Sequence, residues 1–399
     1  MQAFSDEGQD GARVERVRRD LPATEREVYL NNGTYGPLPR PSGDAMREVL
    51  EAEIAGGRLG PGYHERSEAL REEARRLIAG RVAADPDEIA LTPRTTDGLD
   101  IALWGMAWQR GDEILTTREE HPGLLLPLAA LARRTGVRIS FVDTPEQATS
   151  RAWLHAFAAR QTQQTKALAF SHVLWTNGDV LPASELGAWA RGEGLVTIVD
   201  AAQAAGALTV DLHKSQLDFY ALPGQKWLMG PDGIGALYVA QTRLAQCQPT
   251  FVGYLSGTAL DTGAGHFQPA QGARRYEIGS PSQAQLAGLV ASLRWQEEQD
   301  PAWAATRIAS LARELTEALS RLDGVEVRTR VQDAMSGLVS FKVRGREAED
   351  VSAELGRQGL RVRHLPAPHA SVRVSCGFYT QREELGRLVR AVADIAVAV

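Results

Sequence analysis

The sequence predicts an α/β fold, with a large domain built on a mostly parallel sheet and a small α+β domain after it. Up to residue 222, short apolar runs that suit buried strands alternate with helix-sized segments, which is typical of a doubly wound sheet. From residue 282 the pattern changes, because two long helical stretches precede several short strands and a final helix. At 399 residues the chain is also long for a single core, so two domains are expected.

The elements follow from local patterns in chain order. We expect an N-terminal lead with a short helix over residues 1–25, a large domain over 26–280 and a small C-terminal domain over 281–399, which part of the N-terminal segment joins. The expected strands are residues 88–91, 113–116, 137–142, 166–171, 195–199 and 217–222, then 325–329, 336–342, 360–363 and 371–376. The clearest helices are residues 42–54 with Ser42 as N-cap, 64–82, 282–298 and 301–322. Residues 248–271 show neither the helical nor the strand pattern of apolar residues. They are expected to form a long irregular segment, and such segments tend to be functional.

Composition and charge exclude several classes of function. A net charge of −6 gives no reason to expect nucleic acid or an anionic membrane as a partner. Two cysteines cannot make a disulfide framework, and Cys and His show no metal-ligand spacing. The charged N-terminus lacks the apolar core of a signal peptide, and no apolar run approaches the ~18 residues of a membrane span. A cytoplasmic protein without a metal is therefore expected.

The strongest chemical signal is a carboxylate and a lysine at the ends of two neighbouring strands. The run 195–199 lacks alternation, which favours burial on both sheet faces, and it ends at Asp200. The run 217–222 ends in a Pro-Gly-Gln segment that leads to Lys226. Open α/β sheets bind ligands at the carboxyl ends of their strands. Pyridoxal phosphate (PLP) needs such a pair, since a lysine holds it covalently and a carboxylate keeps its pyridine nitrogen protonated.

An isolated Asp or Lys is usually a surface residue, but the surrounding sequence favours the cofactor interpretation. The segments DAAQAAG and GQKWLMGPDGIGALYV resemble the cofactor segment of class V aminotransferase-fold enzymes, which include cysteine desulfurases and isopenicillin N epimerases. The resemblance runs from Tyr29 to the C-terminus. It is strongest to the cystine C–S lyases, through DIALWGMAWQRGDEIL, EEHPGLLLPL, SHVLWTNGDVLP and RRYEIGSPS. It implies a fold type I PLP enzyme with a seven-stranded-type sheet, working as a homodimer with shared active sites.

The resemblance also implies the cofactor contacts. The turn at Thr95 and Thr96 joins a strand to a helix N-terminus, where free N–H groups favour an anion, and it would cradle the phosphate; either threonine is also expected to cap the helix. His121 would stack on the pyridine ring and shuttle protons. The other implied cofactor contacts are Gln203 to the ring oxygen, Gln225 to the phosphate, and Ser280 to the phosphate of the neighbouring subunit. Many relatives have a hydroxyl residue where this chain has Pro223 and a histidine where it has Gln225.

The substrate contacts are expected on two arginines of the small domain. An arginine grips a carboxylate with two parallel hydrogen bonds, and the resemblance assigns that clamp to Arg363 and Arg373. Asn32 and Gly33 lie in a turn-rich loop that crosses the active-site mouth in the family. Cysteine desulfurases have asparagine where this chain has Trp175, which favours the lyase branch.

The cysteines bear on the type of reaction. Desulfurases need a mobile nucleophilic cysteine, and the chain offers only Cys247 and Cys376. Cys376 is three residues after Arg373, and an odd separation along a strand places the two side chains on opposite faces. The sequence therefore predicts β-elimination from cystine, cysteine or a cysteine S-conjugate to pyruvate and ammonia. A desulfurase, an epimerase or transaminase, and a cofactor-free interaction module remain as alternatives.

Overall fold

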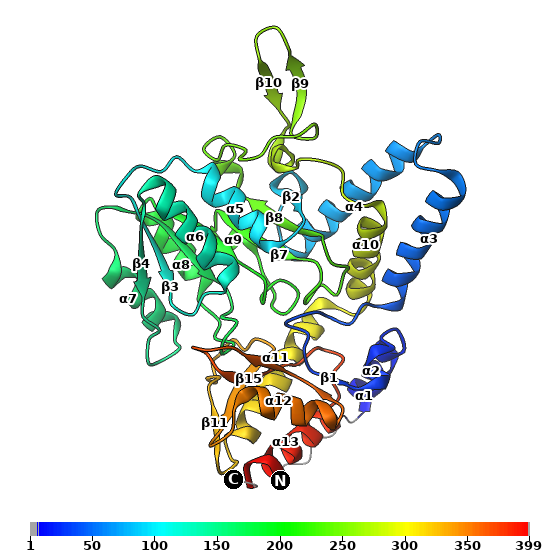
Figure 1. The fold of residues 1–399 in the computed structure, drawn as a ribbon, viewed down its shortest axis with the longest axis vertical. Coiled ribbons are helices and arrows are strands. Elements are labelled where there is room, and N and C mark those ends of the chain that lie inside the picture. The colour runs from blue at the N-terminus through cyan, green and yellow to red at the C-terminus, as the bar shows by residue number, and fades with distance from the viewer. Residues whose placement is uncertain (1–5, 7, 398–399) are drawn as a thin grey trace.

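The computed structural model describes residue 6 and residues 8–397, and it shows an α/β body with a smaller α+β unit beneath it (Figure 1). The expected α/β fold is confirmed. Of the predicted lead and helix over residues 1–25, residues 1–5 and 7 lie outside the described residues. The N-terminal helices are α1 (Gly8–Arg19) and α2 (Ala23–Arg26), and they lie beside the smaller unit rather than beside the large sheet.

A seven-stranded sheet forms the centre of the large body. Its strand order is β2-β8-β7-β6-β5-β3-β4; β4, β3, β5, β6 and β7 run parallel, while β8 is antiparallel to both of its neighbours. The strands are β2 (Ile89–Thr92), β3 (Glu113–Thr117), β4 (Arg138–Val142), β5 (Thr165–Ser171), β6 (Val196–Asp200), β7 (Phe219–Pro223) and β8 (Gly235–Val239). The helices of this body are α3 (Arg40–Gly56), α4 (Tyr63–Val82), α5 (Thr95–Gly105), α6 (Pro122–Thr135), α7 (Ser150–Arg160), α8 (Ala183–Gly192) and α9 (Leu212–Ser215).

The central strands are buried on both faces, as their unbroken apolar runs predict. On β5, Leu168 and Phe170 join one hydrophobic cluster, while Ala167 and Ala169 join the cluster on the opposite face. On β6, Val199 and Ile198 divide in the same way. Side chains alternate across a strand, so a strand covered on both sides has no polar face. Asp200, the last residue of β6, and the turn that follows β7 both lie at the carboxyl edge of this sheet.

The small unit is a four-stranded antiparallel sheet with the order β11-β12-β15-β14. Its strands are β11 (Val325–Val327), β12 (Leu338–Val343), β14 (Arg363–Leu365) and β15 (Ser371–Ser375), and β13 (Leu360–Arg361) pairs with β1 (Val28–Tyr29). Helices α11 (Pro301–Leu319), α12 (Ala348–Arg357) and α13 (Arg382–Val397) pack with this sheet. Helix α12 was not anticipated from the sequence. The β1–β13 pairing joins part of the N-terminal segment to this unit.

Helix α10 (Gln283–Glu298) packs against α3 and α4 of the large body (Figure 1). The domain boundary at residue 280 stays a prediction, and this packing favours placing it after α10. The same contact explains why Ser42 is not an N-cap. Helix α3 begins at Arg40 after Pro39, and the buried Ser42 hydroxyl instead donates to the Gly288 carbonyl at 2.7 Å. A serine inside the first turn therefore fastens two helices together.

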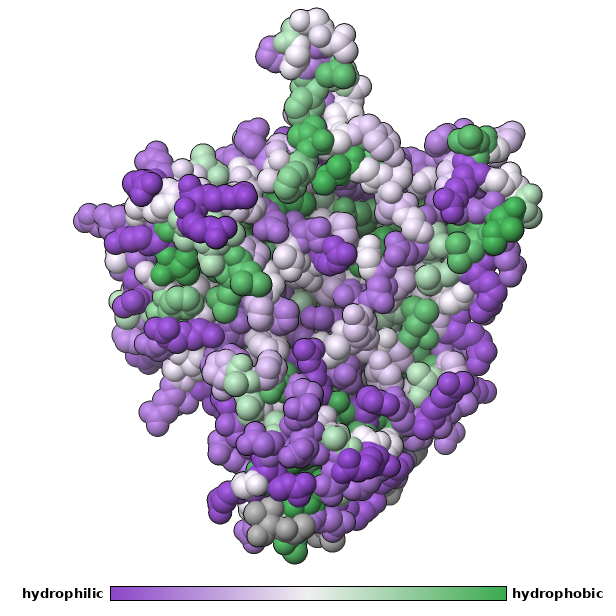
Figure 2. Space-filling model, in the orientation of Figure 1, coloured by the Kyte–Doolittle hydropathy of each residue, from purple (hydrophilic) through white to green (hydrophobic). Residues whose placement is uncertain are grey.

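The expected irregular segment contains a β-hairpin, β9 (Gly257–Asp261) with β10 (His266–Pro269), which projects from the body at the top of Figure 1. The prediction of an irregular segment was wrong here because the hairpin has no buried face. Leu260 and Phe267 are exposed, and Figure 2 shows apolar side chains along the hairpin and at its base. Burial imposes strict alternation on a strand, and without it the strand pattern is lost. Among the described residues, no helix combines the length and apolar character that crossing a membrane requires.

Candidate active site

Asp200 is the last residue of β6 and lies at the carboxyl edge of the sheet. Its side chain is almost fully buried, and its Oδ1 accepts a hydrogen bond from the Ala202 N–H at 2.8 Å. Burial raises the pKa of Asp200, while the charge of Lys226 acts in the opposite direction. The carboxylate is thus held in one orientation by its own turn, with a lysine as the nearby counter-charge.

Lys226 lies on the turn after β7, where the neighbouring strand ends. Burial lowers the pKa of its ammonium to about 8, with Arg373 and Arg363 adding to the effect and Asp200 opposing it. The loop around residues 32–36 packs on this turn: Asn32 Nδ2 donates to the Lys226 carbonyl at 3.4 Å. A Cβ on Gly36 would lie 2.3 Å from that carbonyl, so only glycine fits there. The side chain of Lys226 is only half-buried, and with a pKa of about 8 it is a partly neutral amine near pH 8.

His121 occupies the N-cap position of helix α6, directly before Pro122. Its Nδ1 accepts from the Gly123 N–H at 3.0 Å, which leaves the proton of the neutral ring on Nε2. Burial, together with the charges of Lys226, Arg363 and Arg373, lowers the pKa of His121 to about 4. A neutral, flat imidazole beside Lys226 is the geometry expected for stacking on an aromatic ring.

The N-terminus of α5 lies next to that of α6. The expectation that Thr95 or Thr96 caps α5 was wrong, because Arg94 occupies the N-cap and no side chain caps the first turn. The Thr96 hydroxyl instead donates to the Gly123 carbonyl at 3.3 Å. The leading N–H groups of α5 are therefore not satisfied by a cap, which suits an anion such as a phosphate.

Arg363 and Arg373 occupy facing positions on the antiparallel strands β14 and β15. Both reach the same hydroxyl: Arg363 Nη1 lies 3.1 Å and Arg373 Nη2 lies 3.3 Å from Thr34 Oγ1. Arg373 is only 1% exposed, and its Nη1 donates to the Trp175 carbonyl at 3.0 Å. Burial, together with the charge of Arg363, lowers the pKa of Arg373 to about 9.

Trp175 packs between His121 of the large body and the small unit. Its ring meets His121 edge-on, with 5.0 Å between ring centroids. Its backbone carbonyl holds Arg373, and its indole Nε1 is buried without a hydrogen-bond partner in the part of the chain that the structure describes. Tertiary structure thus gathers Asp200, Lys226, His121, Trp175 and the two arginines around one site.

Comparison with known proteins identifies the family. Residues 28–388 match the family model described as aminotransferase class-V. The chain belongs to this family. It is 30% identical to a probable cysteine desulfurase of Pyrococcus abyssi, over 93% of this chain and 94% of the relative. It is 31% identical to the isopenicillin N epimerase of Streptomyces clavuligerus, over 91% and 94% of the two chains.

Solved structures of a cystine C–S lyase and of a cysteine desulfurase superpose closely on this chain. A complex of the cystine C–S lyase C-DES with its reaction product cysteine persulfide has a TM-score of 0.88 at 30% identity, covering 94% of this chain and 99% of that one. The cysteine desulfurase of Thermococcus onnurineus NA1 also has a TM-score of 0.88, at 27% identity, covering 96% and 98%. Another C-DES structure contains glycine covalently linked to the PLP cofactor. The protein is a PLP-dependent enzyme.

The residues of this chain fit the cofactor. Lys226 would hold it, Asp200 would face its pyridine nitrogen, His121 would cover its ring, and the start of α5 would take its phosphate. Several buried polar atoms have no partner among the described residues, which is what an absent polar ligand leaves behind. Those near the site are Gln225 Oε1, Trp175 Nε1, Arg373 Nε and Ser375 Oγ.

The side chain of Gln203, which was predicted to bind the cofactor ring, forms hydrogen bonds to other residues of the chain. The Gln203 amide bridges the loop to the lysine turn, because its Nε2 donates to the Gly33 carbonyl and its Oε1 accepts from Trp227 Nε1, both at 2.9 Å. A bond from Gln203 to the cofactor ring stays a prediction and would use the remaining amide N–H. A Cβ on Gly33 would lie 2.9 Å from Gln203 Oε1, so this close approach needs glycine.

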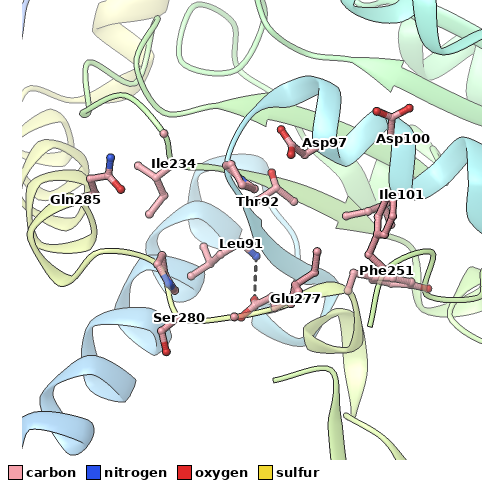
Figure 3. A pocket seen from close by; sticks show the side chains of 16 residues that line it. Leu91, Thr92, Asp97, Asp100, Ile101, Ile234, Phe251, Glu277, Ser280 and Gln285 are labelled. Carbon is pink, nitrogen blue, oxygen red and sulfur yellow. Dashed lines mark hydrogen bonds between the residues drawn. The ribbon is translucent and has the colours of Figure 1, made fainter. Parts of the chain in front are cut away.

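Ser280 lies apart from this group. It is exposed, contacts the Tyr254 hydroxyl, and lines a separate cavity that it shares with Thr92 and Asp97 of the turn around Thr95 and Thr96 (Figure 3). Glu277 lines the same cavity and accepts from the Leu91 N–H at 2.9 Å. Contact of Ser280 with a neighbouring subunit's phosphate stays a prediction.

Sequence reasoning missed two residues of the site. Thr34 contacts both arginines, but in the sequence it is only one hydroxyl residue of a turn-rich loop and gave no clear signal. Glu120 is completely buried: it accepts from Thr117 Oγ1 and the Ser171 N–H at 2.7 and 2.8 Å and also contacts Ser171 Oγ. Burial, with the charge of Asp200 adding and the hydrogen bonds from Ser171 and Thr117 opposing, raises the pKa of Glu120 to about 7. Its position directly before His121 was the only available signal.

Proposed function

We propose that this enzyme is a PLP-dependent β-eliminating C–S lyase that acts on cystine or cysteine-type amino acids. Its products would be pyruvate, ammonia and a sulfur species. The observation that carries the proposal over a desulfurase is the burial of both cysteines in hydrophobic cores. A persulfide relay needs an exposed, ionisable thiol, and neither cysteine offers one.

Cys247 packs under helix α5, where its Sγ lies 3.7 Å from the Ile101 carbonyl, and burial raises its pKa to about 11. Cys376 belongs to the core of the small unit, where burial raises its pKa to about 12. It follows β15 on the side away from the site, while Arg373 of the same strand reaches Trp175 and Thr34. The expected opposite orientation of Cys376 and Arg373 is thus supported by their separate surroundings.

The chain's own groups suit each part of the elimination. PLP, when bound, supplies an electron sink conjugated to the substrate amine. Arg363 and Arg373 would bind the α-carboxylate, because two facing guanidinium groups without a carboxylate partner need an anion. Lys226, a partly neutral amine at pH 8, would remove the α-proton. The Cβ–S bond then breaks with its electron pair going to sulfur, and hydrolysis of the remaining three-carbon enamine gives pyruvate and ammonia.

A homodimer with shared sites is part of this proposal. The β9–β10 hairpin exposes Leu260 and Phe267, and at its base Phe251 and Tyr254 are also exposed. Exposed apolar surface of this kind marks a docking site. Ser280 contacts the same Tyr254. A second copy bound to this surface would therefore bring its own active site near Ser280 of the first copy. Sedimentation of the purified protein should show a dimer, and removal of residues 258–268 should weaken it; a monomer would contradict this part.

Product analysis tests the reaction. The cofactor-loaded enzyme is incubated with L-cystine and, separately, with L-cysteine, and Lys226→Ala serves as the inactive control. Pyruvate with equimolar ammonia, faster from cystine, is the expected result. Alanine would establish desulfuration and overturn the lyase proposal. Neither product would favour epimerisation, the activity for which the Streptomyces clavuligerus relative is named. A cytoplasmic location stays a prediction of the sequence.

A further inference from the structure

Four side chains form a continuous wall between the two units of the molecule. Glu119 Oε2 lies 3.2 Å from His369 Nδ1, the His369 ring meets Trp175 edge-on with 5.8 Å between centroids, and Trp175 meets His121 at 5.0 Å. Glu119 and His121 belong to the loop before α6, whereas His369 belongs to the small unit. The wall therefore starts at the predicted cofactor-facing residue and ends at the boundary between the two units.

His369 is held close to the arginine pair by its own loop. It lies in the short connection between β14 and β15, the two strands that carry Arg363 and Arg373. The His369 N–H donates to the Pro366 carbonyl at 3.0 Å, and its carbonyl accepts from the Ser371 hydroxyl at 2.9 Å. The loop thus folds back from the arginines towards Glu119, and its position follows from strand pairing.

The wall becomes more polar and more accessible as it leaves the site. Trp175 is buried and its indole N–H has no partner among the described residues, while the side chains of His369 and Glu119 remain 16% and 22% exposed. A substrate whose carboxylate is gripped by Arg373 and whose α-carbon faces Lys226 must extend its side chain along some surface. Trp175 is the neighbour that both His121 and Arg373 contact, so the path along it leads to His369 and Glu119.

We propose that His369 is a specificity-determining residue that, together with Glu119, receives the far end of a long, doubly charged substrate. The proposal rests on the proposed lyase function and deepens it. Cystine continues beyond its first sulfur to a second sulfur and a second ammonium and carboxylate. Glu119 is matched to that ammonium, and the imidazolium form of His369, which can donate from Nε2 while its Nδ1–H faces Glu119, is matched to that carboxylate. A substrate with a small leaving group lacks this second ammonium and carboxylate and therefore cannot bind to either residue in this way.

The test compares two substrates that eliminate to the same pyruvate. L-Cystine carries the far end, and β-chloro-L-alanine, which releases chloride, lacks it. Hydrogen bonds to charged groups contribute about 1.5–3 kcal/mol, so the ratio of kcat/KM for cystine to that for β-chloro-L-alanine should fall about tenfold or more in His369→Ala and in Glu119→Gln. The loss should appear in KM for cystine. His155→Ala, on the exposed face of α7, is the matched control and should keep the native ratio.

A binding measurement separates this inference from the reaction itself. In a Lys226→Ala background, which cannot turn over, calorimetry should show about tenfold weaker L-cystine binding when His369→Ala is added. Equal binding with and without the second substitution, or an unchanged substrate ratio, would overturn the role of His369. Failure of the wild-type enzyme to form pyruvate from either substrate would overturn the lyase function, while the binding comparison would still decide the inference.

Discussion

Arg363 and Arg373 stand directly opposite each other across the β14–β15 pair, and among the described residues neither forms an ion pair with a carboxylate. Like charges at facing positions of a sheet destabilise it. Such an arrangement is maintained where an anion binds between the two groups, and two guanidinium forks match the geometry of a carboxylate. The pair is therefore the part of the site that most directly indicates an amino-acid substrate.

Arg373→Lys should raise KM for the amino-acid substrate about tenfold or more, with a smaller effect on kcat. Lysine keeps the charge but loses the planar fork, and a charge-assisted hydrogen bond is worth about 1.5–3 kcal/mol. Steady-state kinetics measures the change. Arg361→Lys is the control, because Arg361 lies two positions from Arg363 and pairs with Glu27 at 2.7 Å. Equal KM values for both variants would exclude the clamp.

The rate at which the cofactor-free protein captures PLP should increase with pH through about 8. Only the neutral amine of Lys226 is nucleophilic, and burial lowers the pKa of this lysine to about 8. Stopped-flow absorbance across pH 6–10.5 follows the capture. Lys214→Ala, at an exposed lysine, should reproduce the wild-type curve. A midpoint near 10.5, the ordinary lysine value, would show that Lys226 is not desolvated.

Glu120→Gln should make the stability of the cofactor-free protein less dependent on pH than that of the wild type between pH 4.5 and 7. The folded pKa of Glu120 is raised from the usual 4.5 to about 7, so the folded state holds this proton longer than the unfolded chain does. The wild-type free energy of unfolding should therefore fall relative to the variant as pH rises from 4.5 to 7, by up to about 3 kcal/mol, and the difference should stay constant above that.

Chemical denaturation at a series of pH values measures this difference for Glu120→Gln. Asp200 faces Glu120 from β6, and Lys226 and His121 lie close by, so their titration is common to both proteins. Glu185→Gln, on the exposed face of α8, should show no pH-dependent difference. A flat difference for Glu120→Gln would mean that Glu120 is ionised throughout this range.

Cys247→Ala and Cys376→Ala should both retain pyruvate formation. Each thiol is buried and its pKa is raised, so neither is a nucleophile in the folded enzyme. Iodoacetamide should leave the native protein unmodified by mass spectrometry and should label both cysteines after denaturation. Rapid labelling of one cysteine in the native state, together with loss of activity in its alanine variant, would restore the desulfurase alternative.

Local sequence determined the framework of the site. Strands β6 and β7 are apolar runs without alternation, and such runs need cover on both faces wherever they lie in the chain. Asp200 and Lys226 are the polar residues that follow those runs, so their place at the carboxyl edge of a parallel sheet could be predicted.

Only the tertiary structure decided which distant residues share that framework. Thr34 contacts both arginines across more than 300 residues of sequence, Glu120 meets Ser171 beside Asp200, and Ser42 bonds to α10 instead of capping α3. The exposed β9–β10 hairpin could not be predicted for a related reason. Neither of its faces is buried, so its sequence lacks the alternation of apolar and polar residues that marks a strand. Periodicity records whether a residue is buried and on which face, but not which partner buries it, and the chemistry of this site depends on the partners.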